Sequence, residues 1–154
     1  MSKMITIGIP TYNRERQLRH QLKSIFEQDL TCVQEVLIID NDSNYDINKL
    51  INEFDNEKIR LLRHPFNIKM ATNMEMPFLF CKTKWLWLLS DDDEVLSNSI
   101  ETIIQEISSC SPQTGMIKFS IDKPMSIQKN HEVITLEEFI DFYYEEKPIP
   151  DFRT

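Results

Sequence analysis

Apolar residues along the chain repeat in two ways, one typical of β-strands and one typical of α-helices. Short apolar or β-branched runs predict strands at residues 4–9, 36–39, 59–62, 85–89 and 116–119. Apolar residues recur at helical spacing within residues 18–26, 47–54, 70–81, 100–107 and 135–144. Because strands and helices alternate, the pattern predicts an α/β fold with a mainly parallel central sheet flanked by helices.

Individual residues indicate where some of these elements begin and end. Pro10 lacks a backbone donor, and we expect it to end the first strand. Asn13 has the side chain of a helix N-cap, and Asn98 followed by Glu101 resembles a capping box. An apolar stripe predicts the third helix, which Pro77 weakens. That stripe consists of Met70, Met74, Phe78 and Cys81.

Polar clusters follow four of the predicted strands. They occupy residues 10–14, 40–43, 63–67 and 90–94. In an open α/β sheet, ligands bind beyond the carboxyl ends of the strands. Each cluster alone is compatible with an ordinary polar loop, but four clusters at one edge of a sheet favour a binding site.

Composition excludes several classes of protein. With 154 residues, 41% of them hydrophobic, the chain has the size of one globular domain. Its formal net charge of −8 argues against a nucleic-acid partner. Because Gly8 and Gly115 are its only glycines, no glycine-rich phosphate loop can be written. Its three cysteines are widely spaced and predict reduced thiols, and no run is long and apolar enough for a signal peptide or a membrane span.

The densest cluster of charge is the run of carboxylates at residues 91–94. Adjacent carboxylates repel one another, and a hard divalent cation relieves that repulsion through oxygen ligation. A solvated turn is the competing interpretation, because the dipole of the following helix favours negative charge at its start. The run is therefore a candidate metal site that needs support from its neighbours.

The cluster at residues 40–44, Asp-Asn-Asp-Ser-Asn, is compatible with several kinds of site. A calcium loop is disfavoured because Tyr45 and Ile51 stand where the glycine and the bidentate glutamate belong. A phosphatase-type D-x-D loop fits poorly, since the motif follows the second strand. A receiver domain needs an acidic pair at residues 10–12, where this chain has Pro-Thr-Tyr. A carboxylate here could instead accept a base N–H from a nucleotide while Tyr12 stacks on the ring.

Four motifs in order resemble the inverting glycosyltransferases of family 2, which have the GT-A fold. Residues 7–14, Ile-Gly-Ile-Pro-Thr-Tyr-Asn-Arg, are similar to the family's opening strand and P-x-Y-N-R turn. Residues 35–43 resemble its second strand with an acidic, serine-containing end, and residues 63–73 resemble its N-x-G-x-x-x-A-x-N region. Residues 87–96, which include Ser-Asp-Asp-Asp, resemble its D-x-D (DXD) region. The resemblance covers about residues 3–110.

This resemblance implies a nucleotide-sugar site on the loops that follow the strands. Thr11 and Tyr12 would contact the nucleoside, and Tyr12 would lie against the base. Asp40 or Asn41 would bind the base edge, and Asp91 would approach the ribose or the sugar. The residues expected at the nucleotide sugar are Pro10, Thr11, Tyr12, Asn13, Arg14, Asp40, Asn41, Asp42, Asn67 and Asp91.

The resemblance also implies a metal cofactor. Asp92 and Asp93 would ligate the Mg²⁺ or Mn²⁺ ion that bridges the diphosphate of the donor. An inverting transfer needs a general base for the acceptor hydroxyl. In the family that base comes from the later, acceptor-binding half, and no residue of this sequence is assigned to it; His64 is the histidine nearest to the expected site.

These expectations describe one Rossmann-like GT-A domain over residues 1–154, short for its family. Residues 3–120 would form the donor- and metal-binding core, and residues 121–154 the start of the acceptor side or a C-terminal tail. The implied enzyme transfers a sugar from a nucleotide-diphosphate sugar to a saccharide or lipid-linked acceptor in polysaccharide biosynthesis, in the cytoplasm or at the inner face of the membrane. The competing interpretation is a truncated, non-catalytic module that binds nucleotide sugars.

Overall fold

The computed structural model describes residues 4–93, 95–117 and 119. The chain divides into two compact units, residues 1–109 and 110–154, and every described helix and strand lies in the first unit. The described residues of the predicted fifth strand, Met116, Ile117 and Phe119, belong to no strand, so that prediction is wrong at these positions. The helix predicted at residues 135–144 lies outside the described residues.

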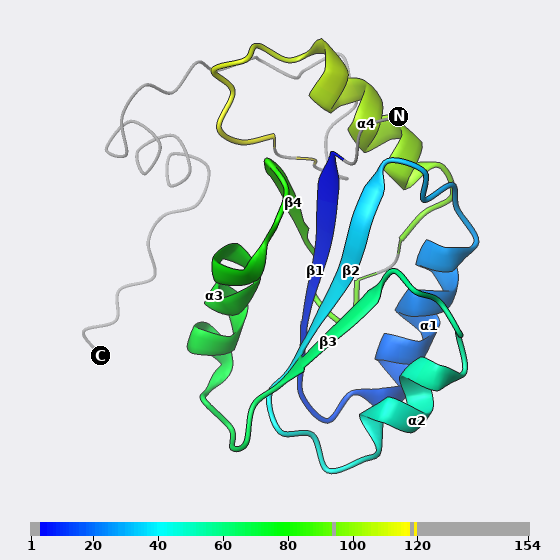
Figure 1. Ribbon diagram of the computed structural model, residues 1–154, viewed down its shortest axis with the longest axis vertical. Helices are drawn as coiled ribbons and strands as arrows, with labels where there is room; N and C mark the ends of the chain where they lie inside the picture. The colour runs from blue at the N-terminus through cyan, green and yellow to red at the C-terminus, as the bar shows by residue number, and fades with distance from the viewer. Residues whose placement is uncertain (1–3, 94, 118, 120–154) are drawn as a thin grey trace, which may run out of the picture. The chain divides into compact units, whose positions relative to one another are not determined.

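A sheet of four parallel strands forms the centre of the first unit (Figure 1). The strands are β1 (Ile5–Thr11), β2 (Val33–Asp40), β3 (Ile59–Arg63) and β4 (Trp85–Leu88). Their order across the sheet is β3-β2-β1-β4. The alternation of strands and helices therefore predicts this part of the fold correctly, because parallel neighbours require a crossover between them.

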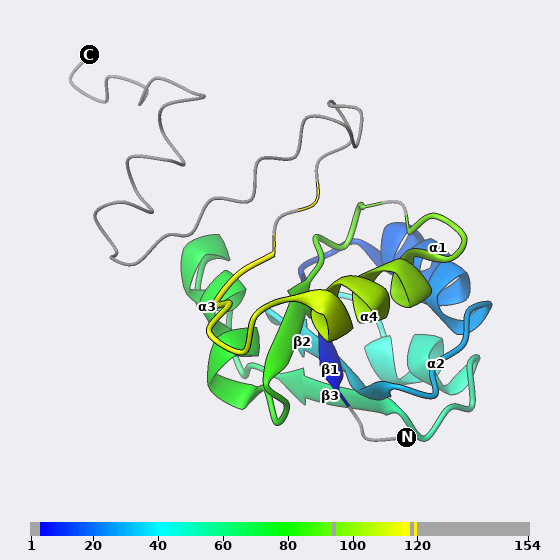
Figure 2. The same cartoon turned by 90° about the horizontal axis from the view of Figure 1, so that it is seen from above.

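Helices cover both faces of this sheet. They are α1 (Glu15–Phe26), α2 (Ile47–Asn52), α3 (Met70–Phe80) and α4 (Ser99–Ser109). Figure 2 shows α1 and α2 on one side of the strands and α3 on the other. In Figure 1, α4 lies at the end of the sheet opposite the loops that follow β1, β2 and β3. Those loops lie at the carboxyl edge of the sheet, where ligands bind in an open α/β fold.

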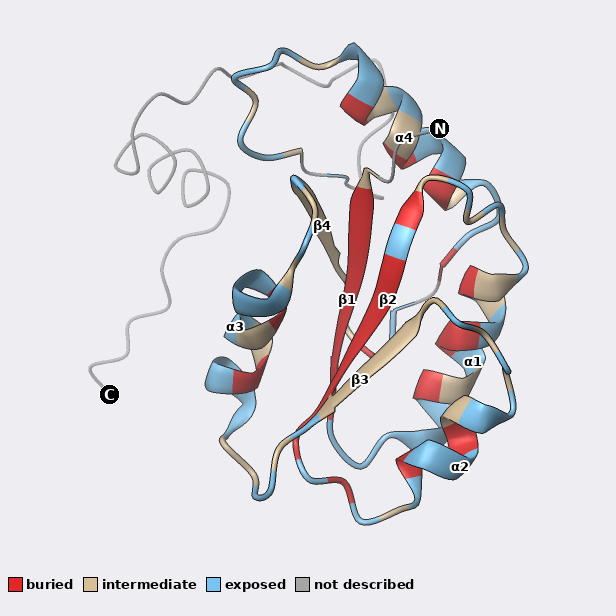
Figure 3. Ribbon diagram, viewed as in Figure 1, coloured by how far each residue is buried: buried red, intermediate tan, exposed pale blue. Residues whose placement is uncertain are grey.

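The two central strands form the centre of the core (Figure 3). Every residue of β1 is buried, and Gln34 alone is exposed on β2. From α1, Leu18, Leu22 and Ile25 pack onto this core with no exposed surface. Strands buried on both faces carry continuous apolar runs, which is why β2 shows no alternation of polar and apolar residues.

β1 continues through Pro10 to Thr11, so the prediction that Pro10 ends the strand is wrong. Backbone groups of successive strand residues point alternately to the two neighbouring strands. The Gly8 carbonyl accepts from the Leu89 N–H beyond β4 at 2.9 Å, whereas the Thr11 carbonyl accepts from the Asn41 N–H beyond β2 at 3.0 Å. Pro10 therefore faces the β4 side, where the pairing with β1 has already ended at Gly8. No ladder hydrogen bond is lost there.

α3 packs on the sheet through residues other than its predicted apolar stripe. Its buried residues are Asn73 and Pro77, while Met70 and Phe78 of the stripe are 80% and 64% exposed. The helix carries apolar residues around its whole circumference, so their spacing does not determine which face is buried. Gly8 on β1 decides it, because the absence of a side chain there admits the Pro77 ring.

Candidate functional site

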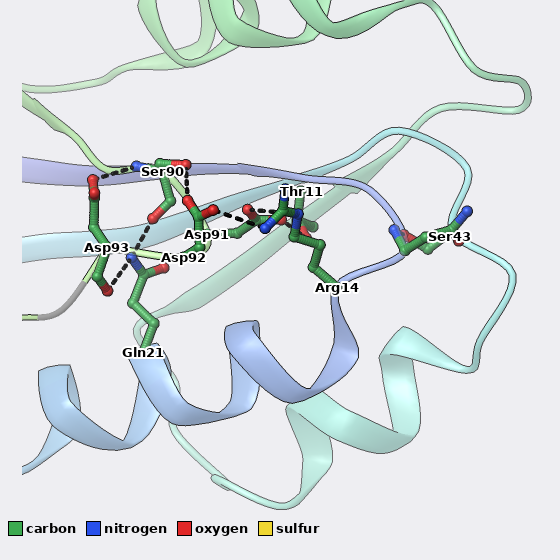
Figure 4. Close-up of polar contacts among 9 residues, drawn as sticks. Thr11, Arg14, Gln21, Ser43, Ser90, Asp91, Asp92 and Asp93 are labelled. Atoms are coloured by element: carbon green, nitrogen blue, oxygen red, sulfur yellow. Dashed lines mark hydrogen bonds and ion pairs between the residues drawn. The ribbon is translucent and has the colours of Figure 1, made fainter.

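A buried hydrogen bond joins the carboxyl ends of β1 and β4 (Figure 4). Thr11 Oγ1 donates to Asp91 Oδ2 at 2.7 Å, across 80 residues of sequence. Thr11 is the last residue of β1, and Asp91 lies in the loop that follows β4. The structure thus brings two of the residues expected at the nucleotide sugar into direct contact.

The acidic loop after β4 is held by its own serine. Ser90 Oγ donates to Asp92 Oδ1, and the Ser90 backbone N–H donates to Asp93 Oδ2 at 2.9 Å. The Asp93 N–H in turn donates to the Ser90 carbonyl at 3.1 Å. The two expected metal ligands, Asp92 and Asp93, therefore accept hydrogen bonds from different groups of Ser90, its hydroxyl and its backbone N–H.

Arg14 connects this acidic loop to the start of α1. Its Nη1 lies 2.7 Å from Asp92 Oδ2, and its Nε lies 3.7 Å from Asp91 Oδ1. The Arg14 and Asp92 side chains are 45% and 46% exposed, while the Asp91 side chain is 9% exposed. The guanidinium thus spans a buried and an exposed carboxylate at the open edge of the sheet.

The two carboxylates have opposite pKa shifts. Burial raises the pKa of Asp91, although the hydrogen bond from Thr11 and the charge of Arg14 act against it. The hydrogen bond from Ser90 lowers the pKa of Asp92, with a further contribution from Arg14. Neighbouring residues of one loop therefore differ in how readily they hold a negative charge.

The loop after β1 is tied to the loop after β2 through Asn13. The Asn13 N–H donates to Ser43 Oγ at 2.9 Å, and Asn13 Oδ1 accepts from the Asn44 N–H at 2.7 Å. The prediction that Asn13 caps α1 is therefore wrong: Arg14 occupies the N-cap position without a side-chain cap hydrogen bond. Asn13 has φ of 56°, a left-handed conformation that asparagine tolerates better than most residues.

Asp40, at the end of β2, is a fully buried carboxylate. Its Oδ1 accepts from the Ser43 N–H at 3.0 Å, and its Oδ2 lies 3.3 Å from Arg63 Nε at the end of β3. Arg63 also lies 3.6 Å from Asp42 Oδ1, and the Asp42 side chain is 44% exposed. Asp42 is therefore the more accessible carboxylate of this cluster.

Tyr45 adds an aromatic hydroxyl beside the same cluster. Burial first, and the charge of Asp40 second, raise the pKa of Tyr45 to about 12. Tyr45 is not among the residues expected at the site. In the sequence it is only a residue that disfavours a calcium loop. With its pKa raised, Tyr45 keeps its proton at neutral pH, and its hydroxyl can serve as a donor.

Asn41 and Asn67 are hydrogen-bonded to each other. Asn41 is 2% exposed, its Nδ2 donates to Asn67 Oδ1 at 3.1 Å, and its Oδ1 accepts from the Ile68 N–H at 2.8 Å. Asn67 Oδ1 also accepts from the Lys69 N–H at 2.8 Å. These contacts fasten the loop before α3 to the end of β2, so both asparagines shape the edge of the site.

Gln21 is a site residue that sequence reasoning missed. It is 1% exposed on α1, and its Nε2 donates to the Ser90 carbonyl and, at 3.4 Å, to the Asp93 carbonyl. Figure 4 shows the side chain reaching from the helix to the acidic loop. The sequence places this amide side chain within the apolar stripe of the helix, between Leu18 and Leu22. A polar side chain that is buried there needs a hydrogen-bond partner.

Tyr12 and His64 also lie at the carboxyl edge of the sheet. Tyr12 is 43% exposed and follows the end of β1, so its ring is accessible to a ligand. The His64 N–H donates to the Asp40 carbonyl at 2.9 Å, and its Nε2 is buried without a hydrogen-bond partner among the described residues. His64 therefore lies against the β2 end.

Among residues 4–93, 95–117 and 119, no group of three or more His, Cys, Asp or Glu side chains converges on a common point suited to a metal ion. No helix in that same part of the chain is long and apolar enough to cross a bilayer.

Solved structures match the fold of this chain. S. aureus TarS, residues 1–349, aligns with a TM-score of 0.62 and 17% identity, over 68% of this chain and 32% of that one. The TarS complex with UDP-GlcNAc aligns with the same TM-score over 31% of its chain. At this identity the likeness concerns the fold alone, and it defines a Rossmann-like GT-A fold.

The family model described as "Glycosyl transferase family 2" matches residues 6–148. The chain therefore belongs to glycosyl transferase family 2, as the four motifs predict. Among curated relatives, the glycosyltransferase GlyG of Streptococcus pneumoniae is 24% identical over 70% of this chain. The GalNAc(5)-diNAcBac-PP-undecaprenol beta-1,3-glucosyltransferase of Campylobacter jejuni is 26% identical over 66% of it. The chain spans about a third of the length of these relatives, 36% and 34% respectively.

Proposed function

We propose that the chain is the donor-binding part of a glycosyltransferase that moves a sugar from a nucleotide-diphosphate sugar to a saccharide or lipid-linked acceptor. The observation that carries this proposal is the buried Thr11–Asp91 contact at 2.7 Å, which unites the ends of β1 and β4 in a family 2 fold. The motifs expected to bind a nucleotide sugar thereby share one open edge of the sheet.

The nucleoside would lie against the loops after β1 and β2. Tyr12 offers an exposed ring for stacking on the base, and Asp42 offers the exposed carboxylate for a base N–H. Asp40 and Asn41 are buried and already hydrogen-bonded, so their contribution would be to hold this pocket in shape. Asp91 would face the ribose or the sugar.

The residues beside Asp91 fit a hard divalent cation. Asp92 is an accessible carboxylate that already carries one positive partner, the Arg14 guanidinium at 2.7 Å. Asp92, with Asp93, would hold Mg²⁺ or Mn²⁺. When bound, such an ion neutralises the charge of the departing nucleoside diphosphate. The sequence supplies no glycine-rich loop for that purpose.

In this proposal, the saccharide or lipid-linked acceptor and the inversion at the transferred sugar are inferred from membership of the family. An inverting transfer requires a general base, and we assign it to no described residue. A lipid-linked acceptor is supported by the undecaprenol in the name of the C. jejuni relative.

Isothermal titration with UDP-GlcNAc, GDP-mannose and dTDP-glucose in the presence of Mn²⁺ tests donor binding. TarS binds UDP-GlcNAc in its solved complex, so the UDP-sugar is the first probe. We expect Asp92→Ala to weaken binding, whereas Glu57→Ala, which removes an exposed carboxylate before β3, should leave it unchanged. If wild type binds none of these donors, the proposal is wrong.

The second candidate function is a non-catalytic module that binds nucleotide sugars. Its support is that no described residue is assigned the role of the general base that an inverting transfer requires. A turnover assay separates the two functions: release of UDP from UDP-GlcNAc, with or without an added acceptor, would exclude the binding-only module.

A further inference from the structure

Both carboxylate oxygens of Asp92 already have partners. Oδ1 accepts from Ser90 Oγ, and Oδ2 lies 2.7 Å from Arg14 Nη1. Arg14 Nε lies 3.7 Å from Asp91 Oδ1. A metal ion that binds Oδ2 of Asp92 must therefore share that oxygen with the Arg14 guanidinium or displace it.

Two cations cannot share that oxygen without repelling each other. The Arg14 side chain is 45% exposed, so it can leave Asp92 without opening a cavity in the core. It extends from the N-cap position of the 12-residue helix α1, where backbone N–H groups and the helix dipole favour an anion. A guanidinium is well suited to phosphate oxygens because it can donate two parallel hydrogen bonds.

We propose, as an extension that rests on the proposed function, that Arg14 is an exchangeable counter-cation of the metal site. Its guanidinium and the divalent cation compete for Asp92 Oδ2. When the cation binds, the displaced guanidinium turns to the diphosphate of the donor at the start of α1. Arg14 thereby opposes binding of the metal alone and favours binding of the metal together with the donor.

This exchange gives a signature that a structural role would not. If Arg14 merely positioned the acidic loop, its removal would weaken metal binding. If Arg14 competes with the metal, its removal strengthens binding of the metal alone and weakens binding of the donor. The two effects have opposite signs in one variant.

Electron paramagnetic resonance of Mn²⁺ with the full chain, without any nucleotide, measures the first effect. We expect Arg14→Gln to raise Mn²⁺ affinity about two- to fivefold, the range for an exposed ion pair. Arg16→Gln is the matched control, because it removes the same charge from an exposed position on α1. Arg14→Lys keeps the charge and should stay close to wild type in this assay.

Titration of UDP-GlcNAc at saturating Mn²⁺ measures the second effect. We expect Arg14→Gln to weaken donor binding about tenfold, the loss of a charge-assisted hydrogen bond, and Arg16→Gln to have no effect. Mn²⁺ affinity of Arg14→Gln that is equal to or lower than that of Arg16→Gln would overturn the exchange, as would absence of Mn²⁺ binding by Arg14→Gln. Failure of wild type to bind any donor contradicts the proposed function instead, and the Mn²⁺ comparison can still be made.

Discussion

Thr11 Oγ1 and Asp91 Oδ2 form a hydrogen bond of 2.7 Å that is buried between the end of β1 and the loop after β4. β1 is a central strand and β4 an edge strand of the sheet. The acidic loop is therefore anchored to a buried central strand, while Asp92 and Asp93 are exposed.

Removing the Thr11 hydroxyl should destabilise the protein. Thr11→Val keeps the shape of the side chain but leaves a buried oxygen of Asp91 without its donor, at a cost of about 1–2 kcal/mol in the free energy of unfolding. Urea denaturation measures the change. Thr72→Val, at an exposed position of α3, is the control and should cost much less. Equal effects of both substitutions would show that the contact contributes nothing.

The opposite pKa shifts of Asp91 and Asp92 predict a titration order. Burial raises the pKa of Asp91 above its ordinary 3.8, and the Ser90 hydrogen bond lowers the pKa of Asp92 below it. NMR titration of the carboxyl carbons should therefore show Asp92 losing its proton at lower pH than Asp91. A common midpoint, or the reverse order, would contradict these environments.

The same shift fixes the sign of a pH effect on stability. Between the unfolded pKa of Asp91 and its raised folded value, the folded state binds more protons than the unfolded state. The stability that Asp91 contributes is therefore present below its unfolded pKa and is lost as the pH rises through its folded pKa. Asp91→Asn should gain stability relative to wild type over that interval, as measured by urea unfolding at a series of pH values.

Gln21 should be required for the shape of the acidic loop. Gln21→Met keeps the length of the side chain but removes the amide that donates to the Ser90 carbonyl, which should cost about 1–2 kcal/mol and weaken binding of Mn²⁺ and donor. Gln17→Met, at an exposed position on the same helix, is the matched control. Unchanged donor binding by Gln21→Met would show that the loop holds its shape without this contact.

The two glycines provide an internal comparison of packing. A Cβ added at Gly8 would lie 2.7 Å from the Pro77 Cβ and 3.0 Å from Leu86 Cδ1, whereas one added at Gly115 meets nothing within 4 Å. Gly8→Ala should therefore cost about 1–3 kcal/mol through overpacking between β1 and α3. Gly115→Ala should leave the free energy of unfolding almost unchanged. If Gly8→Ala left the free energy of unfolding unchanged, α3 would be free to shift away from the sheet.

Two local predictions from single residues are wrong. Pro10 does not end β1, because the strand loses its β4 neighbour before the missing N–H would matter. Asn13 does not cap α1, because its side chain accepts from the Asn44 N–H in another loop. Each residue has a local preference, and a partner or a missing neighbour distant in sequence overrides it.

The sequence by itself determined the alternation of strands and helices, the parallel sheet, and the edge at which the polar clusters gather. These properties depend on the periodicity of burial, which each segment records in its own residues. The tertiary structure alone decided which side chains meet: Thr11 with Asp91, Arg14 with Asp92, and Gln21 with the Ser90 carbonyl. Those partners lie 69 to 80 residues apart, and periodicity carries no information about contacts between loops.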